Sequence, residues 1–149
     1  PLRLASLERD GALPPRHLAL SHSGDWVYCA ATRTAIGLDI ETTEDRAPRD
    51  WQALAQAAGA PAERTELAAL AEPSAQGRRF LTLWTLKEAW FKQQGQGLDW
   101  ALLPRLRTHP ASGETAQARV WQDMDNTLAL VTDADAAHLP VRWLEGPSS

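Results

Sequence analysis

The sequence predicts an α+β fold in which an antiparallel sheet packs against one long central helix. Residues Phe80–Lys92 contain no Gly or Pro, and Leu, Lys, Glu and Ala dominate their middle, which is typical of a helix. Short segments of alternating apolar residues elsewhere in the chain indicate strands. The helical and strand segments do not alternate regularly, so the pattern favours α+β over a parallel βαβ arrangement.

Size and composition limit the classes of protein to consider. The 149 residues are enough for one domain with a core, and the net charge of −4 argues against a general nucleic-acid surface. The single cysteine, Cys29, excludes an internal disulfide and fits a reducing compartment. The sequence has no apolar run of about 18 residues and no signal peptide at its start. We therefore expect a cytoplasmic protein with neither nucleic acid nor membrane as a partner.

The first elements expected after an irregular lead-in, Pro1–His17, are two strands. Leu18–Leu20 and Val27–Ala31 alternate in polarity, and the polar residues Ser21–Asp25 between them indicate a turn. Ser and Gly are common in hairpin turns for local reasons. The same turn could instead bind an anion through His22, a Ser hydroxyl and backbone N–H groups. Taken alone, the composition favours a simple turn.

The next strand, Ala35–Glu41, carries two carboxylates on one face. Ile36, Leu38 and Ile40 share the apolar face, so Gly37, Asp39 and Glu41 share the other. Asp39 and Glu41 would lie about 6–7 Å apart along the strand. Like charges in such positions repel unless a cation lies between them, and Mg²⁺ prefers hard oxygen ligands. A metal site and a solvated polar strand end both remain open at this point.

The remaining elements are expected from apolar periodicity and from Gly and Pro breaks. The central helix should follow a loop, Pro73–Gly77, and end near Gly95–Gly97. Two Ala-rich helices are expected before it, at Asp50–Ala58 and Pro61–Leu70. Three short strands are expected after it, at Ala116–Trp121, Thr127–Thr132 and Val141–Leu144.

The central helix carries charged residues beside its apolar arc. Lys87 falls inside this arc, so its ammonium either reaches past the apolar surface to water or meets an anion in a pocket. Glu88 and Lys92 lie one turn apart at the border of the arc. Taken alone, they are explained by a surface pair worth about 0.3–0.5 kcal/mol.

Three segments in fixed order resemble the motifs of the 4′-phosphopantetheinyl transferases, in particular the larger, surfactin-synthetase-activating type. They are Ser21-His22-Ser23, Gly37-Leu38-Asp39-Ile40-Glu41 and Trp84-Thr85-Leu86-Lys87-Glu88-Ala89-Trp90-Phe91-Lys92. The resemblance covers about residues 18–98. It implies that residues 1–34 supply the closing strands of a first half, with the Ser21–Gly24 turn, and that residues 35–149 form the catalytic half.

The resemblance also implies a reaction. The family transfers the 4′-phosphopantetheine arm of coenzyme A to a serine of an acyl or peptidyl carrier protein and releases 3′,5′-ADP. Asp39, Glu41 and Glu88 would bind Mg²⁺, for which Mn²⁺ could substitute. Glu88 would be the base, directly or through a metal-bound water, and Lys92 would offset charge on the leaving phosphate. The residues that would contact coenzyme A are Ser21 and His22 at its 3′-phosphate, Trp84 as a wall of the site, and Lys87 and Lys92 at its phosphates or arm.

Two departures from the family pattern leave alternatives open. Larger members bind the coenzyme between two similar halves, and this chain resembles the second half plus the closing strands of the first. Either the chain is a fragment, or copies of it complete each other's sites in a homo-oligomer. The alternative to a transferase is a module that binds coenzyme A or a carrier protein and has lost turnover. An unrelated Mg²⁺-dependent phosphohydrolase is a third reading, for which the sequence offers no nucleophile.

Overall fold

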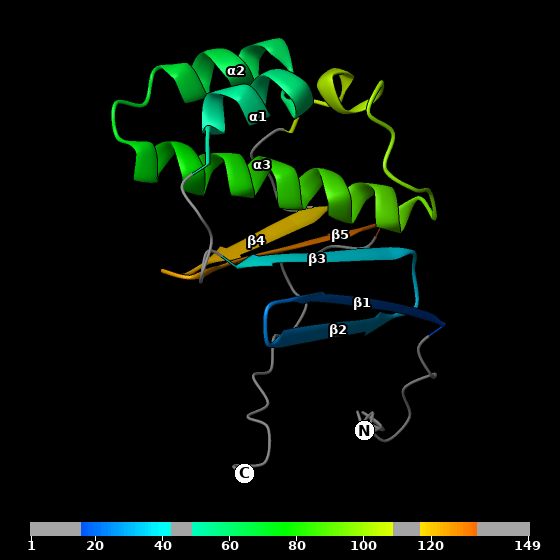
Figure 1. Ribbon diagram of the computed structural model, residues 1–149. Coiled ribbons are helices and arrows are strands. Elements are labelled where there is room, and N and C mark those ends of the chain that lie inside the picture. The colour runs from blue at the N-terminus through cyan, green and yellow to red at the C-terminus, as the bar shows by residue number, and fades with distance from the viewer. Residues whose placement is uncertain (1–15, 43–48, 109–116, 134–149) are drawn as a thin grey trace.

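The computed structural model describes residues 16–42, 49–108 and 117–133 and confirms the α+β fold class. Its elements form layers around a long helix, with two shorter helices on one side and strands on the other (Figure 1). The predicted lead-in Pro1–His17 and the predicted strand Val141–Leu144 lie wholly or almost wholly outside the described residues. Within the described ranges, no helix has the length and apolar character needed to cross a membrane.

The first two strands form the predicted hairpin, but the turn is shorter than expected. β1 (His17–Ser23) pairs antiparallel with β2 (Trp26–Thr32), and Gly24 takes the positive φ of 56° that the tight turn requires. The expectation of a turn over Ser21–Asp25 is therefore wrong for Ser21–Ser23, which belong to β1. These polar residues fit a strand because the hydroxyls of Ser21 and Ser23 accept hydrogen bonds from the backbone N–H groups of Ile40 and Thr42 in the third strand.

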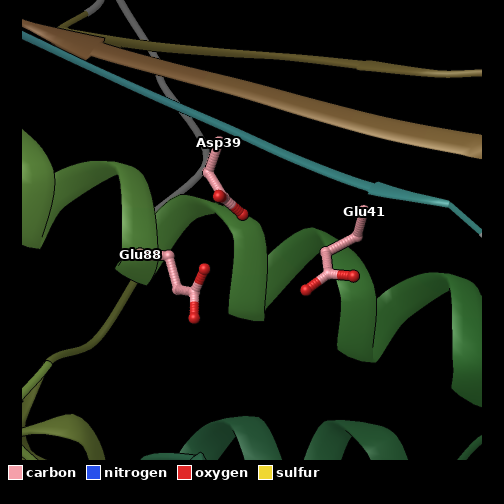
Figure 2. A group of neighbouring side chains, drawn as sticks. All are labelled: Asp39, Glu41 and Glu88. Carbon is pink, nitrogen blue, oxygen red and sulfur yellow. The ribbon is translucent and has the colours of Figure 1, made fainter. Parts of the chain in front are cut away.

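The main sheet has three antiparallel strands in the order β3-β5-β4. They are β3 (Ile36–Thr42), β4 (Ala118–Gln122) and β5 (Asn126–Thr132), close to the predicted segments. As predicted, the apolar side chains of β3 share one face, where they pack with Leu128 and Leu130 and with residues of the hairpin. The opposite face of β3, which carries Asp39 and Glu41, is turned towards the long helix (Figure 2).

The helices follow the predicted order with one early start. α1 (Trp51–Ala58) is capped by Asp50, whose side chain accepts the N–H of Ala53, and α2 (Pro61–Ala68) begins at a proline. The long helix α3 (Pro73–Gln93) includes Pro73–Gly77, which were expected to form a loop. Gly77 is accommodated there because the ring of Trp51 occupies the space that a Cβ would need. A short 3₁₀ helix, η1 (Leu103–Arg105), follows.

α3 and β3 touch backbone to backbone. A Cβ built on Gly37 would overlap the carbonyl oxygen of Ala89 and lie 2.5 Å from the backbone nitrogen of Gln93. Ala89 is fully buried against Ala129 and Val131 of β5. Gly37, which lies between Ile36 and Leu38, thus lets the helix approach the sheet closely.

Candidate active site

Three carboxylates from two elements meet where α3 crosses β3. Asp39 and Glu41 lie on β3 and Glu88 lies on α3, and one ligand oxygen from each lies within 4.8 Å of the others. Figure 2 shows the three side chains grouped beside the helix. The structure therefore brings together residues that are 47–49 positions apart in sequence and that the motifs predicted to act together.

Asp39 is the buried member of this carboxylate cluster, with 3% of its surface exposed. Its Oδ1 accepts hydrogen bonds from Lys92 Nζ at 2.6 Å and from Ser21 Oγ at 3.1 Å. Its Oδ2 is buried, and no hydrogen bond from the described residues reaches it. A buried carboxylate oxygen without a donor is costly, and a bound cation would satisfy it.

The donor set fits a magnesium ion. Mg²⁺ binds oxygen ligands at about 2.0–2.1 Å, so two ligands on opposite sides of the ion are about 4.2 Å apart. The oxygens of the carboxylate cluster span at most 4.8 Å, so small side-chain movements or a bridging water would close the difference. Carboxylates on an open pocket are also the usual Mg²⁺ ligands, since the ion keeps several waters or phosphate oxygens.

Electrostatics in the cluster favour a proton or a cation. Burial, followed by the negative charge of Asp39, raises the pKa of Glu88 to about 7. Burial also raises the pKa of Asp39, although the hydrogen bond and charge of Lys92 act against this. Ionising Asp39 and Glu88 together therefore costs free energy unless a further positive charge lies close to them.

Glu41 and Trp84 form a pair at the edge of the cluster. The indole Nε1–H of Trp84 donates a hydrogen bond of 3.1 Å to Glu41 Oε1. The Trp84 ring also stacks on Phe80 and lies 6.0 Å from the ring of Trp100. The observed contact of Trp84 thus orients one carboxylate, whereas its expected contact with coenzyme A stays a prediction.

An open pocket joins the cluster to β1. Its lining comprises Leu20–Ser23, Asp39–Glu41, Glu88 and Lys92. His22 is exposed on this lining, where a phosphate could reach it. Ser21 is placed differently from expectation: its buried hydroxyl donates to Asp39 and accepts from Ile40 N and Lys92 Nζ. Ser21 therefore holds Asp39, and its expected contact with the 3′-phosphate of coenzyme A stays a prediction.

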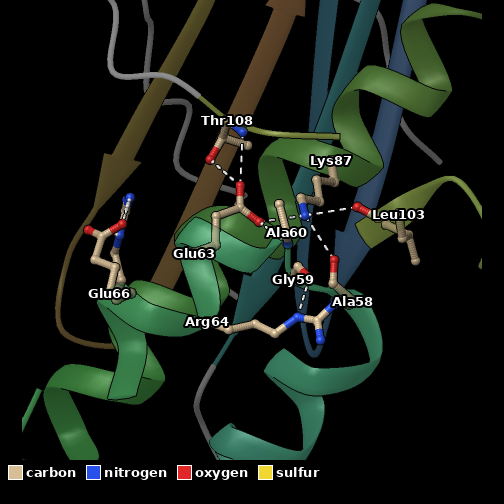
Figure 3. A network of polar contacts seen from close by, with 10 residues as sticks. Ala58, Gly59, Ala60, Glu63, Arg64, Glu66, Lys87, Leu103 and Thr108 are labelled. Carbon is tan, nitrogen blue, oxygen red and sulfur yellow. Dashed lines mark hydrogen bonds and ion pairs between the residues drawn. The ribbon is translucent and has the colours of Figure 1, made fainter. Parts of the chain in front are cut away.

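Lys87 requires a second correction. Its side chain is 2% exposed, and its Nζ donates to Glu63 Oε2 at 2.7 Å, Ala58 O at 2.8 Å and Leu103 O at 3.0 Å (Figure 3). An ammonium has three donors, so these contacts use all of them. The expectation that Lys87 contacts a phosphate or the arm of coenzyme A is therefore wrong for this structure.

Glu63 is the residue that the sequence analysis missed. It is buried, and its oxygens accept from Ala60 N, Thr108 N and Oγ1, and Lys87 (Figure 3). Burial acts to raise the pKa of Glu63, but these hydrogen bonds outweigh it and the pKa is lowered. A glutamate two residues after a helix-starting proline, facing its own helix N-terminus, was the available signal.

Comparisons with known proteins point in one direction. A family model described as the 4′-phosphopantetheinyl transferase superfamily matches residues 35–139. A 4′-phosphopantetheinyl transferase of Bacillus subtilis is 39% identical over 92 residues, covering 59% of this chain and 37% of that protein. The 4′-phosphopantetheinyl transferase Sfp of Bacillus subtilis (strain 168) is 38% identical over 87 residues, covering 58% and 37%.

A shorter relative is covered more fully. The 4′-phosphopantetheinyl transferase AcpT of Salmonella typhi is 34% identical over 108 residues, which cover 71% of this chain and 54% of that protein. The chain therefore spans 37% of the length of the two Bacillus relatives and about half of the Salmonella one.

Proposed function

The chain belongs to the 4′-phosphopantetheinyl transferase superfamily, and on this premise we propose that it transfers the phosphopantetheine arm of coenzyme A. The acceptor is a serine hydroxyl of an acyl or peptidyl carrier protein, and 3′,5′-ADP leaves. The family membership confirms the resemblance, and the matched residues 35–139 include the motifs Gly37–Glu41 and Trp84–Lys92. The reaction, its partners and its metal are proposals, because the chain spans 37% of its first relatives.

One observation carries the proposal: the carboxylates of Asp39, Glu41 and Glu88 converge, with the ammonium of Lys92, on the pocket that His22 lines. A pyrophosphate must be neutralised before a hydroxyl can attack it, and this pocket offers cation ligands and a cation. We further propose that residues up to 34 belong to a first half and residues from 35 to the catalytic half. The β1-β2 hairpin forms a two-stranded sheet of its own beside the β3-β5-β4 sheet, which supports this division.

The three carboxylates would hold Mg²⁺, or Mn²⁺ in its place. When bound, the ion would neutralise the pyrophosphate and stabilise charge on its leaving side. Asp39 is fixed for this role by Ser21, and Glu41 by Trp84. Both neighbours restrict the side-chain orientations of the proposed ligands.

Glu88 is the proposed base. Without a bound cation, burial and the charge of Asp39 raise the pKa of Glu88 to about 7. A cation held by the three carboxylates would lower this pKa, so Glu88 would be ionised at neutral pH and able to accept a proton. It would take the proton of the serine hydroxyl as the serine oxygen bonds to the phosphorus that carries the pantetheine arm. The bond from that phosphorus to the bridging oxygen breaks, and the electron pair leaves with 3′,5′-ADP. Lys92 would offset the charge that grows on this leaving phosphate, and His22 would contact the 3′-phosphate.

The test is intact-mass analysis of a carrier protein incubated with coenzyme A and Mg²⁺. Glu88→Gln keeps the side-chain volume and removes the base, so the kcat should fall by about 10²–10⁴. The matched control is Glu66→Gln, on the α2 surface, where Glu66 pairs with Arg79 at 2.8 Å. EDTA should abolish the modification in the wild type, and Mg²⁺ or Mn²⁺ should restore it.

Two results would contradict the proposal. A wild-type rate in Glu88→Gln would refute the role of Glu88 as the base. Full transfer in the presence of EDTA would refute the metal dependence of the reaction. Tight binding of coenzyme A without any modification of carrier proteins would instead indicate a binding module.

A further inference from the structure

Lys92 lies in the carboxylate cluster at a position where a divalent cation would also be attracted. Its ammonium is 2.6 Å from Asp39 Oδ1 and 3.1 Å from Ser21 Oγ. A metal ion bound to the same carboxylate would lie within about 5 Å of that ammonium. At this range two positive charges repel strongly in a partly buried site. A metal ion on the unpartnered Oδ2 of Asp39 and the Lys92 ammonium on Oδ1 would therefore compete through charge repulsion at the same carboxylate.

The contact of Lys92 has a clear role without a metal. Asp39 is 3% exposed, and an ionised carboxylate at that depth is costly unless a cation pairs with it. Lys92 supplies the positive charge, and its N–H groups supply the hydrogen bond. In the metal-free protein the Lys92 ammonium therefore neutralises the charge of Asp39, and in the metal-bound protein the metal ion would do so.

Lys92 also has the freedom to move. Its side chain is 40% exposed, and it projects from the last turn of α3 on a flexible four-carbon stem. Lys87, five residues earlier on the same helix, is 2% exposed and donates to three buried oxygens. The two lysines thus differ in mobility: one is held in the core and the other can turn outward into the pocket that it lines.

We propose that Lys92 is a displaceable counter-ion of the carboxylate cluster, which pairs with Asp39 in the metal-free protein and leaves it when a divalent cation binds. The proposal rests on the metal site of the proposed function. The released ammonium then lies at the pocket rim, where it meets an anion brought by the metal. Lys92 thereby links metal binding to anion binding, because the metal releases the Lys92 ammonium, which can then pair with the anion.

The exchange predicts the direction of a change in metal affinity. A metal that must displace Lys92 binds with an apparent affinity reduced by the fraction of molecules in which Asp39 is free. If Lys92 is away from Asp39 for about 1–10% of the time, as for a minor conformer, Lys92→Met should bind Mn²⁺ about 10- to 100-fold more tightly. A lysine that only orients Asp39 for the metal predicts the opposite change.

The first experiment follows the lysines directly. The 149 residues contain two lysines, Lys87 and Lys92, so ¹⁵N-lysine labelling gives one ammonium signal from each. Lys92→Arg removes one of the two signals and thereby assigns both. Saturating Mg²⁺ should shift the Lys92 signal and speed its hydrogen exchange with water. The Lys87 signal should stay in place, as an internal control in the same helix.

The second experiment measures Mn²⁺ binding by the electron paramagnetic resonance of the free ion. Wild type, Lys92→Met and Arg79→Met are compared, since Arg79 is on α3 but pairs with Glu66 outside the cluster. Tighter binding by Lys92→Met alone supports the exchange. If Mn²⁺ binds the wild type while the Lys92 signal stays unchanged, or if Lys92→Met binds no more tightly, the exchange is refuted and the metal site stands. If neither protein binds Mn²⁺, the metal site and the exchange both fail.

Discussion

Lys87→Met tests the assignment of this lysine to the core. Methionine has a similar length and leaves little empty space, so the change removes mainly the ammonium and its three contacts with Glu63, Ala58 and Leu103. The side chains of Lys87 and Glu63 are 2% and 3% exposed. Removing one partner of such a buried pair costs about 3–5 kcal/mol, because the other charge remains buried. That is a large part of the roughly 5–15 kcal/mol that stabilises a typical domain.

The free energy of unfolding is measured by urea titration with circular dichroism, and the midpoint by a thermal scan. A loss of this size lowers the Tm by roughly 6–20 °C for a chain of about 150 residues. Arg79→Met is the control, because it breaks the exposed pair with Glu66 and should cost at most about 1 kcal/mol. Glu63→Gln in combination with Lys87→Met removes both charges, so the double variant should be less destabilised than the sum of the single changes.

The result that would refute this reasoning is a stability loss below about 1 kcal/mol in Lys87→Met together with a raised KM for coenzyme A. That pattern belongs to a lysine that contacts a ligand, as the motif alone suggested. A purely additive double variant would likewise show that the pair with Glu63 contributes nothing specific.

Three further predictions follow from the same contacts. His22→Ala should raise the KM for coenzyme A far more than for dephospho-coenzyme A, which lacks the 3′-phosphate; equal changes would leave His22 as a strand residue only. Gly37→Ala should prevent native packing, since its Cβ would overlap the backbone of Ala89, and a wild-type Tm would contradict this contact. Because the pKa of Glu88 rises from 4.5 to about 7 on folding, the native state holds its proton more tightly. Metal-free stability should therefore fall by about 1–2 kcal/mol, after allowance for partial exposure, as pH rises from 4.5 to 7. Glu88→Gln should lack this slope, and an unchanged slope in that variant would assign it to other groups.

The parts of the fold and site that follow from local pattern could be predicted. Alternation along β3 placed Asp39 and Glu41 on one face, and the helical period placed Glu88 and Lys92 together on α3. The family motifs then joined the two elements, which periodicity alone could not do. The apolar face of β3 likewise followed from the alternation of Ile36, Leu38 and Ile40.

The corrections all concern partners that are distant in sequence. Ser21 looked like a turn residue because its bonds to Asp39 and Ile40 cross between strands. Lys87 looked like a ligand contact because its acceptor, Glu63, lies 24 residues away on another helix. The start of α3 at Pro73 was missed because Gly77 is normally unfavourable in a helix, and the Trp51 ring that fills its place is also distant in sequence.

The position of the carboxylate cluster follows from the packing of α3 on β3. Ala89 lies directly over Gly37. Glu88, one residue earlier on the helix, therefore lies at the edge of this contact, close to Asp39 of β3. Lys92 is three residues after Ala89, and it reaches the same carboxylate from the next turn. The site thus depends on two residues with minimal side chains that carry no chemistry. Any side chain larger than these at the contact would move the helix from the strand and separate the oxygens that now lie within 4.8 Å.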